Sequence, residues 1–191
     1  MDLTTFLQRS PHLNRDDWAA EFATKWTPVH LPKGACLSGQ EQDESGEYIL
    51  LQGALVSTIC DPDGREVCVD FYLSPCVVTP NIARTRDGVS RVSIVATTPA
   101  SLARIDSNLL SDLMITSGRI RQWANDILSD ALSAKADREW SLAALGGAAR
   151  LDWFRASHPD HETIFPHTYI ASFLGVTPVT LSRLRAERRE E

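Results

Sequence analysis

Residues 166–185 read PHTYIASFLGVTPVTLSRLR. The apolar side chains before Gly175 recur at helical spacing, which predicts one short helix. Gly175 suits the left-handed turn that ends such a helix, because glycine has no Cβ to clash there. Thr177 then predicts an N-cap, and Pro178 predicts the first residue of a second helix. The stretch therefore predicts two helices that meet at a short turn.

The second predicted helix has one apolar and one polar side. Leu181 and Leu184 are expected to be buried, which leaves polar and Arg side chains facing outward. This arrangement is typical of a helix-turn-helix, and the alternative is an ordinary helical hairpin with a solvated Arg face. Because cap, glycine, proline and basic residues all agree, DNA binding is favoured. The residues expected to contact DNA are Thr168, Thr177, Pro178, Val179, Thr180, Ser182, Arg183, Arg185, Arg188 and Arg189.

Composition limits the class of protein. The 191 residues are 43% hydrophobic and 23% charged, which is typical of a globular chain of one large or two small domains. The net charge of -6 does not suit non-specific coating of nucleic acid, although residues 166–191 hold four Arg and three Glu. No apolar run approaches the ~20 residues of a spanning helix, and the N-terminus does not resemble a secretory signal. We expect a cytoplasmic protein without a membrane partner.

The rest of the chain changes its pattern twice. Residues 1–27 carry apolar positions at helical spacing, which predicts two short helices. Residues 29–105 alternate β-prone runs with turn residues at intervals typical of a small antiparallel barrel or roll. Helical spacing returns at Ser107, and a long helix is predicted from Arg119 to about Leu145. Gly146 and Gly147 end it, and one more short helix follows over 148–157.

The sequence thus predicts an α+β protein. Its expected parts are a small antiparallel barrel or roll with N-terminal helices (1–116), a long helix (117–145) and a small all-α helix-turn-helix domain (146–191). The long helix carries an apolar seam with a period of about 3.5 residues, which favours pairing with another helix. The expected dimer interface is formed by Ile120, Ala124, Ile127, Ala131 and Ala134.

The segment 169–185 resembles the DNA-reading motif of the CRP/FNR family of bacterial transcription regulators. The family's order is an antiparallel β-roll resembling a cyclic-nucleotide-binding jelly roll, a long dimerisation helix and a helix-turn-helix, and it matches nearly the whole chain. Gly34, Gly53 and the turn 63–66 resemble the glycines and hairpin of the family's roll, and residues 148–158 resemble the helix before its DNA-reading pair. The resemblance implies a homodimer that binds a palindromic site in double-stranded DNA. RNA polymerase and a small-molecule effector are the further partners it implies.

Two features depart from the family pattern. Residues 77–81 lack the glycine and glutamate of the family's Phe-Gly-Glu-type segment, and the position of its phosphate-binding Arg falls on Ser90. We therefore expect cyclic AMP to bind weakly or not at all, and we predict no cofactor. The residues that could hold another anion are Arg84, Arg86, Ser90 and Arg91. Because Glu191 follows the second helix closely, no two-stranded wing is expected.

Other chemistries receive less support. The sequence contains no G-x-S-x-G, H-E-x-x-H or G-x-x-x-x-G-K-[ST] motif, so we expect no enzyme and no catalytic residue. The histidines of 158–167 fit no standard zinc spacing, and a polar loop without metal is expected there. A haem-binding sensor would need one of His30, Cys36, Cys60, Cys68 or Cys76 as an axial ligand.

The alternative of a different class is a small-ligand-binding or protein-interaction module with a degenerate helix-turn-helix. It leaves the exposed arginines of the C-terminal helix without an evident purpose, and the transcription regulator is therefore preferred. The hypothesis of a haem-binding sensor would be excluded if the purified protein showed no absorbance band near 400 nm.

Overall fold

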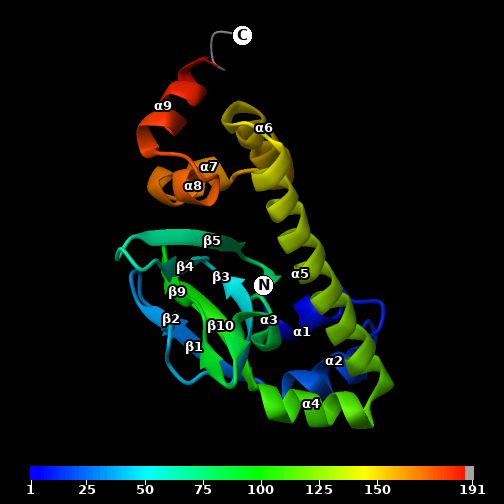
Figure 1. Ribbon diagram of the computed structural model, residues 1–191. Helices are drawn as coiled ribbons and strands as arrows, with labels where there is room; N and C mark the ends of the chain where they lie inside the picture. The colour runs from blue at the N-terminus through cyan, green and yellow to red at the C-terminus, as the bar shows by residue number, and fades with distance from the viewer. Residues whose placement is uncertain (188–191) are drawn as a thin grey trace.

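The computed structural model describes residues 1–187 (Figure 1). Its body is a β-roll of two antiparallel four-stranded sheets, with strand orders β1-β10-β3-β6 and β2-β9-β4-β5, and β7 and β8 form a small separate ribbon. The strands are β1 (Thr27–Leu31), β2 (Cys36–Ser38), β3 (Gly46–Gln52), β4 (Ala54–Cys60), β5 (Glu66–Leu73), β6 (Cys76–Val77), β7 (Thr85–Arg86), β8 (Val89–Ser90), β9 (Ser93–Ala96) and β10 (Ala100–Asp106).

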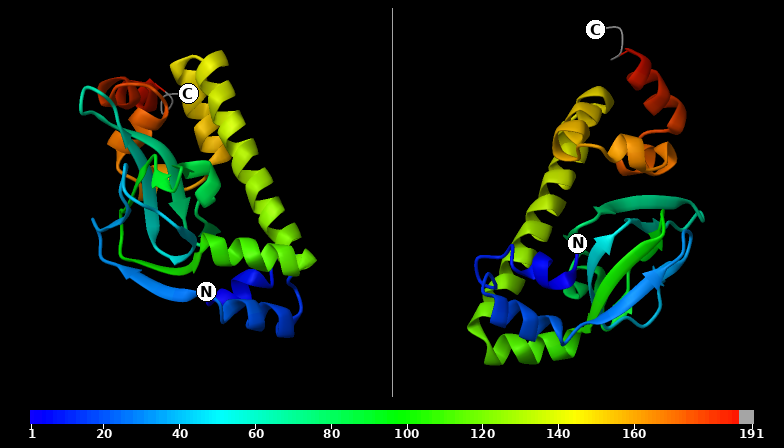
Figure 2. Two further views of the ribbon diagram at one scale, coloured as in Figure 1. Left: turned by 60° about the horizontal axis from the view of Figure 1, so that its bottom comes forward. Right: turned by 180° about the vertical axis from the view of Figure 1, so that it is seen from behind.

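Helices surround the roll on two sides. The long helix α5 runs along the molecule from the N-terminal helices to the C-terminal ones (Figure 2). None of the helices in residues 1–187 is long and apolar enough to cross a membrane. The helices are α1 (Leu3–Leu7), α2 (Asp16–Ala23), α3 (Asn81–Arg84), α4 (Ser107–Thr116), α5 (Gly118–Ala144), α6 (Gly147–Ser157), α7 (His161–Ile164), α8 (His167–Phe173) and α9 (Pro178–Glu187).

Glycines set the tight turns of the roll. Gly53 joins β3 to β4 with φ +96°, and a Cβ there would clash with the carbonyl oxygen of Pro99. Gly64 closes the β4–β5 hairpin with φ +78°, and its N–H donates to the carbonyl of Asp61 at 2.9 Å. The hairpin predicted from the sequence is therefore confirmed.

The first sheet has a different core on each face. Because successive side chains of a strand point to opposite faces, Leu50 enters the roll interior while Ile49 faces the helices. Ile49 packs with Phe22, Trp26 and Trp123, among other residues of α1, α2, α4 and α5. The N-terminal helices and the first half of α5 are thus anchored to the outside of this sheet.

The second sheet is also covered on both faces. Leu55 of β4 faces the interior of the roll, whereas Val56 packs in one cluster with the C-terminal helices. Burial on both faces explains why β4 reads as a nearly continuous apolar run. Phe71 of β5 lies opposite Val56 and contacts Phe165 and Phe173, with ring centroids 4.7 and 5.1 Å apart. The C-terminal helices are therefore packed directly on the roll.

The structure confirms the α+β class with an antiparallel roll and a helical C-terminal part. The predicted long helix and the helix predicted over 148–157 are found as α5 and α6. The shortest elements, β2, β6, α3, β7, β8 and α7, were not predicted. They have two to four residues each, too few for a hydrophobic period to show in a sequence.

Candidate nucleic-acid interface

The helix-turn-helix consists of α8, a four-residue turn and α9. Gly175 has φ +66° in this turn, and Thr177 caps α9 because its Oγ1 accepts from the N–H of Thr180 at 3.1 Å. Pro178 is the first residue of α9. The turn, the cap and the proline position all agree with the sequence prediction.

The inner side of α9 belongs to the core shared by the C-terminal helices and the roll. Leu181 and Leu184 are buried there together with Leu151 and Ile170. The outer side is open, since Val179 is 80% exposed and Ser182 is exposed as well. In Figure 1, α9 lies on the side of α8 that is turned away from the roll. The predicted division of this helix into a buried and an exposed side is confirmed.

The two described arginines of α9 have different surroundings. The Arg183 side chain is 72% exposed, and its Nε lies 3.7 Å from Glu187 on the next turn. The Arg185 side chain is only 24% exposed, and its Nε lies 3.1 Å from the carboxylate of Glu162 in α7. Glu162 also accepts from Arg155 of α6 at 2.5 Å. Arg185 therefore joins α9 to α6 and α7, a correction to its expected place on the DNA-contacting side.

The remaining predicted contact residues are distributed around this motif. Thr168 is exposed in the first turn of α8, and Pro178 is exposed at the start of α9. Thr180 is half-buried, and its hydroxyl lies 2.9 Å from that of Thr177 within the cap. Arg188 and Arg189 lie outside the described residues.

An arginine of the long helix connects this motif to the roll. Arg138 of α5 donates to the carbonyl of Phe173 in α8 at 3.2 Å and to that of Cys68 in β5 at 3.4 Å. Its guanidinium lies 4.5 Å from the centroid of the Phe173 ring. The N–H of Cys68 donates to Ser172 Oγ at 3.0 Å, which adds a direct bond between roll and α8. No local sequence pattern reveals this clamp formed by Arg138, Cys68 and Phe173, because the three residues lie far apart in the chain.

The expected dimer seam is only partly free in the single chain, where Ala134 is exposed and Ala131 is half-buried. Ile120 is 8% exposed in a single chain and packs in the cluster that holds α5 against the roll and the N-terminal helices. Ala124 and Ile127 pack partly against the same cluster. A periodic seam shows which side of a helix is apolar, but it does not show which helix, sheet or partner chain packs against that side. The opposite side of α5 exposes Leu132 and Trp140, each 57% accessible.

The four residues expected to hold an anion do not form one cluster. Arg84 is 3% exposed, donates to the carbonyls of Thr79 and Gly46, and lies 3.5 Å from Glu44. Ser90 is also buried, and its hydroxyl donates to a backbone carbonyl at 2.7 Å. Arg86 and Arg91, together with Ser90, line a surface hollow that also contains the acidic side chains of Glu41 and Asp87. Arg84 is thus a structural residue of the roll interior, not a solvated loop residue.

Histidines of the predicted polar loop pack among aromatic rings. The ring of His158 stacks on Phe154 with a centroid distance of 4.9 Å, and His161 lies 5.2 Å from Phe165. Burial, together with the nearby His161, lowers the pKa of His158 to about 4. Within residues 1–187 no three His, Cys, Asp or Glu side chains gather in a metal-binding group.

The candidate haem ligands are scattered over the roll. His30, Cys36 and Cys60 are exposed on β1, β2 and the end of β4. Cys68 is buried in β5, where burial raises the pKa of its thiol, and burial raises that of Cys76 to about 12. Both of these thiols are therefore held in their neutral form at neutral pH.

No protein-family model matches the chain, and no curated protein sequence matches it either. Solved structures do match. FixK2 from Bradyrhizobium japonicum superposes with a TM-score of 0.75 at 18% identity over 86% of this chain and 85% of that one. A CooA mutant from Carboxydothermus hydrogenoformans gives a TM-score of 0.74 at 15% identity, with coverage of 93% and 82%.

The regulator CLP from Xanthomonas campestris matches with a TM-score of 0.72 at 16% identity, and 90% of each chain is covered. Such low identities establish the fold alone, but they do so over most of each chain. The chain has the fold of the CRP/FNR-type regulators, a β-roll followed by a long helix and a C-terminal helix-turn-helix.

Proposed function

We propose that this protein is a homodimeric, sequence-specific DNA-binding transcription regulator that recognises a palindromic operator. The observation that carries the proposal is the open outer side of α9, where Arg183 and Val179 are exposed although the opposite side of the helix is buried. The capped, glycine-containing turn and the packed underside hold this outer side rigid, as a recognition helix requires.

The outer side of α9 offers contacts for base edges in the major groove. Arg183 has the fork of donors that pairs with guanine O6 and N7, and Val179 can contact a thymine methyl group. Ser182 can donate to a phosphate or a base. The Thr180 hydroxyl is occupied by the cap, so its methyl group is the part available to DNA.

The dimer is proposed to form through the outer side of α5. Leu132, Ala136 and Trp140 recur every four residues and are all exposed, so they form a stripe on this side. Leu132 and Trp140 are more than half exposed, and exposed apolar side chains of this size mark an interaction surface when they adjoin. A second copy of the same stripe is the partner, because a palindrome requires two identical recognition helices related by a two-fold axis.

Cyclic AMP is not the proposed effector. A buried phosphate needs a paired cation, and Ser90 supplies none. Arg84, the buried arginine nearest in sequence, already binds two carbonyls and Glu44. We expect calorimetry with cyclic AMP to show no micromolar or tighter binding, and such binding would contradict this part of the proposal.

Selection of bound fragments from random DNA, with and without cyclic AMP, tests the function. We expect enrichment of a two-fold symmetric sequence whose half-sites lie about one helical turn, or about 10 base pairs, apart. Cyclic AMP should not change the enriched sequence. Absence of any sequence preference would contradict the regulator proposal and would favour the ligand-binding or protein-interaction module.

A further inference from the structure

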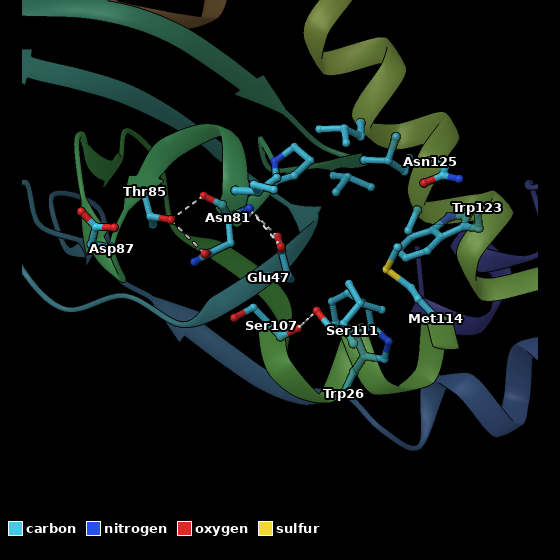
Figure 3. A pocket seen from close by; sticks show the side chains of 17 residues that line it. Trp26, Glu47, Asn81, Thr85, Asp87, Ser107, Ser111, Met114, Trp123 and Asn125 are labelled. Carbon is cyan, nitrogen blue, oxygen red and sulfur yellow. Dashed lines mark hydrogen bonds between the residues drawn. The ribbon is translucent and has the colours of Figure 1, made fainter. Parts of the chain in front are cut away.

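A cavity of about 410 Å³ lies outside the β-roll, bordered by the first sheet and by α3, α4 and α5 (Figure 3). Its volume falls within the range of about 300–1,000 Å³ that is usual for small-molecule sites. Glu47 of β3 contributes to its wall from the face that also carries Ile49, whereas Tyr48 between them faces the roll interior. The cavity is therefore separate from the interior that contains Arg84.

One end of this cavity is apolar. Met114 of α4 and Trp123 of α5 line it, and Trp26 stands across from Trp123 with ring centroids 6.3 Å apart (Figure 3). Trp26 is 7% exposed, and its indole N–H has no hydrogen-bond partner among the described residues. A buried donor without a partner is costly and uncommon, which marks this wall as incompletely satisfied in the free protein.

The other end of the cavity is polar and acidic. Asn81, Thr85 and Asp87 lie there with Glu47, as Figure 3 shows. The carboxylate of Glu47 accepts from the backbone N–H of Asn81 at 3.0 and 2.9 Å. Burial raises the pKa of Glu47 to about 7, against the lowering effects of that bond and of the Arg84 charge. None of the described residues that line the cavity is basic.

We propose that this cavity binds a small organic amine, with its ammonium group at Glu47 and its apolar body against Met114 and Trp123. A cation pairs with the half-buried carboxylate of Glu47, whereas an anion would face two carboxylates in a lining that holds no basic residue. Aromatic rings and a thioether form a suitable wall for a flat or flexible apolar body. Binding at this site does not depend on DNA recognition, but a role as the effector site rests on the proposed function.

Three matched probes test the proposal by calorimetry on the whole protein without DNA: 4-phenylbutylamine, 4-phenylbutanol and 5-phenylpentanoate. They share the apolar body and differ in the charge of the polar end. The amine is expected to bind at least tenfold more tightly than the carboxylate, with the alcohol between them. Equal or tighter binding of the carboxylate would overturn the proposal, as would absence of amine binding at millimolar concentration.

Substitution of Glu47 tests whether the amine binds in this cavity. Glu47→Gln is expected to weaken the amine about tenfold and to change the alcohol less than twofold, because only the amine pairs with the carboxylate. Glu139→Gln removes the same charge from an exposed position of α5 outside the cavity and serves as the control. Unchanged amine affinity in Glu47→Gln would overturn the assignment.

A second variant covers the case in which Glu47→Gln fails to fold, as judged by circular dichroism. Ala124 lines the cavity and is half-buried, so Ala124→Phe should fill the space and abolish binding of both amine and alcohol. Retained binding of the amine in this variant would likewise contradict the site. Because no DNA is present, failure of these experiments is distinguishable from failure of DNA recognition.

Discussion

Arg183 and Arg185 show how two residues of one helix can have opposite roles. Arg183 has a single exposed contact at 3.7 Å, and such pairs contribute little to stability. Arg185 is mostly covered and is held by Glu162, which itself binds Arg155. Of the described arginines of α9, Arg183 is the one that is free to extend to a base.

Arg183→Ala should therefore lower specific DNA affinity by about 1–3 kcal/mol per half-site and relax the preference at one base pair. Titration of the selected operator and of random DNA measures both effects. The control is Arg65→Ala on the β4–β5 hairpin, whose side chain is 73% exposed and thus matches Arg183. This control should leave the ratio of specific to random affinity unchanged. An equal loss on both DNAs in Arg183→Ala would make Arg183 a phosphate contact.

Protonation of His158 should destabilise the fold. Its pKa is about 4 in the native state and about 6.5 in the unfolded chain, so the unfolded state binds more protons between these values. The stabilisation gained by keeping His158 neutral in the folded protein is complete above pH 6.5 and is lost as the pH falls toward 4. We expect this loss to lower the free energy of unfolding by only about 1 kcal/mol, because solvent screens the partly exposed ring.

Thermal unfolding at pH 7.5 and pH 5 tests this, with His158→Phe compared with the wild type. The variant keeps a ring against Phe154 but cannot take up a proton, so it should lose less stability on acidification. His30→Phe, at an exposed position of β1, should follow the wild type. Identical pH dependence of wild type and His158→Phe would show that this ring does not titrate in the proposed range.

Features of single residues can be predicted from the sequence where their determinants are local. The φ of Gly175 and the cap by Thr177 depend on neighbours within a few positions, and both were predicted. The pairing of Arg185 with Glu162 and the burial of Arg84 depend on residues that only the fold brings together. Nothing in the local pattern distinguishes such an arginine from a solvated one.

At the scale of elements, Arg138 is the point where α5, α8 and β5 meet. Arg138→Ala should lower the free energy of unfolding by about 1.5–3 kcal/mol, because two carbonyls lose a charged donor. It should also speed amide hydrogen exchange in α8 and β5 more than in α1 and α2. Chemical denaturation and hydrogen exchange measure the two effects.

Two comparisons separate this clamp from a general effect of charge. Arg138→Lys keeps the charge but lacks the planar fork, so it should recover only part of the stability. Arg121→Ala removes an exposed arginine of the same helix and should change stability by about 0.5 kcal/mol or less. If Arg121→Ala were as destabilising as Arg138→Ala, the clamp would have no special role.

The elements themselves were predicted well where they are long. Gly146 and Gly147 predict where α5 ends, whereas its apolar seam, expected to face a partner chain, includes Ile120 of the core of its own chain. Periodicity locates the apolar side of a helix, and only the packing of the roll and N-terminal helices shows what covers it. The acidic cavity was missed for the same reason, because β3, α3, α4 and α5 form it jointly.

At the scale of the whole molecule, the dimer and DNA recognition are coupled. One α9 contacts one half-site, so high affinity for a palindrome requires two chains with a fixed spacing. Pairing through the outer stripe of α5 is suited to fix the spacing between the two α9 helices, since α5 continues directly toward α6 and the helix-turn-helix (Figure 2). Loss of the dimer should therefore affect whole operators much more than isolated half-sites.

Leu132→Glu is the variant that tests this coupling. It places a charge in the middle of the stripe, where two copies would bring like charges together, and light scattering at micromolar concentration should then show monomers. Affinity for the whole operator should fall at least tenfold, while affinity for one half-site should change less than twofold. Ile115→Glu makes the same kind of change at a 76% exposed position of α4 and should leave a dimer. A dimeric Leu132→Glu protein, or a wild type that is itself monomeric, would show that the outer stripe of α5 does not join two chains.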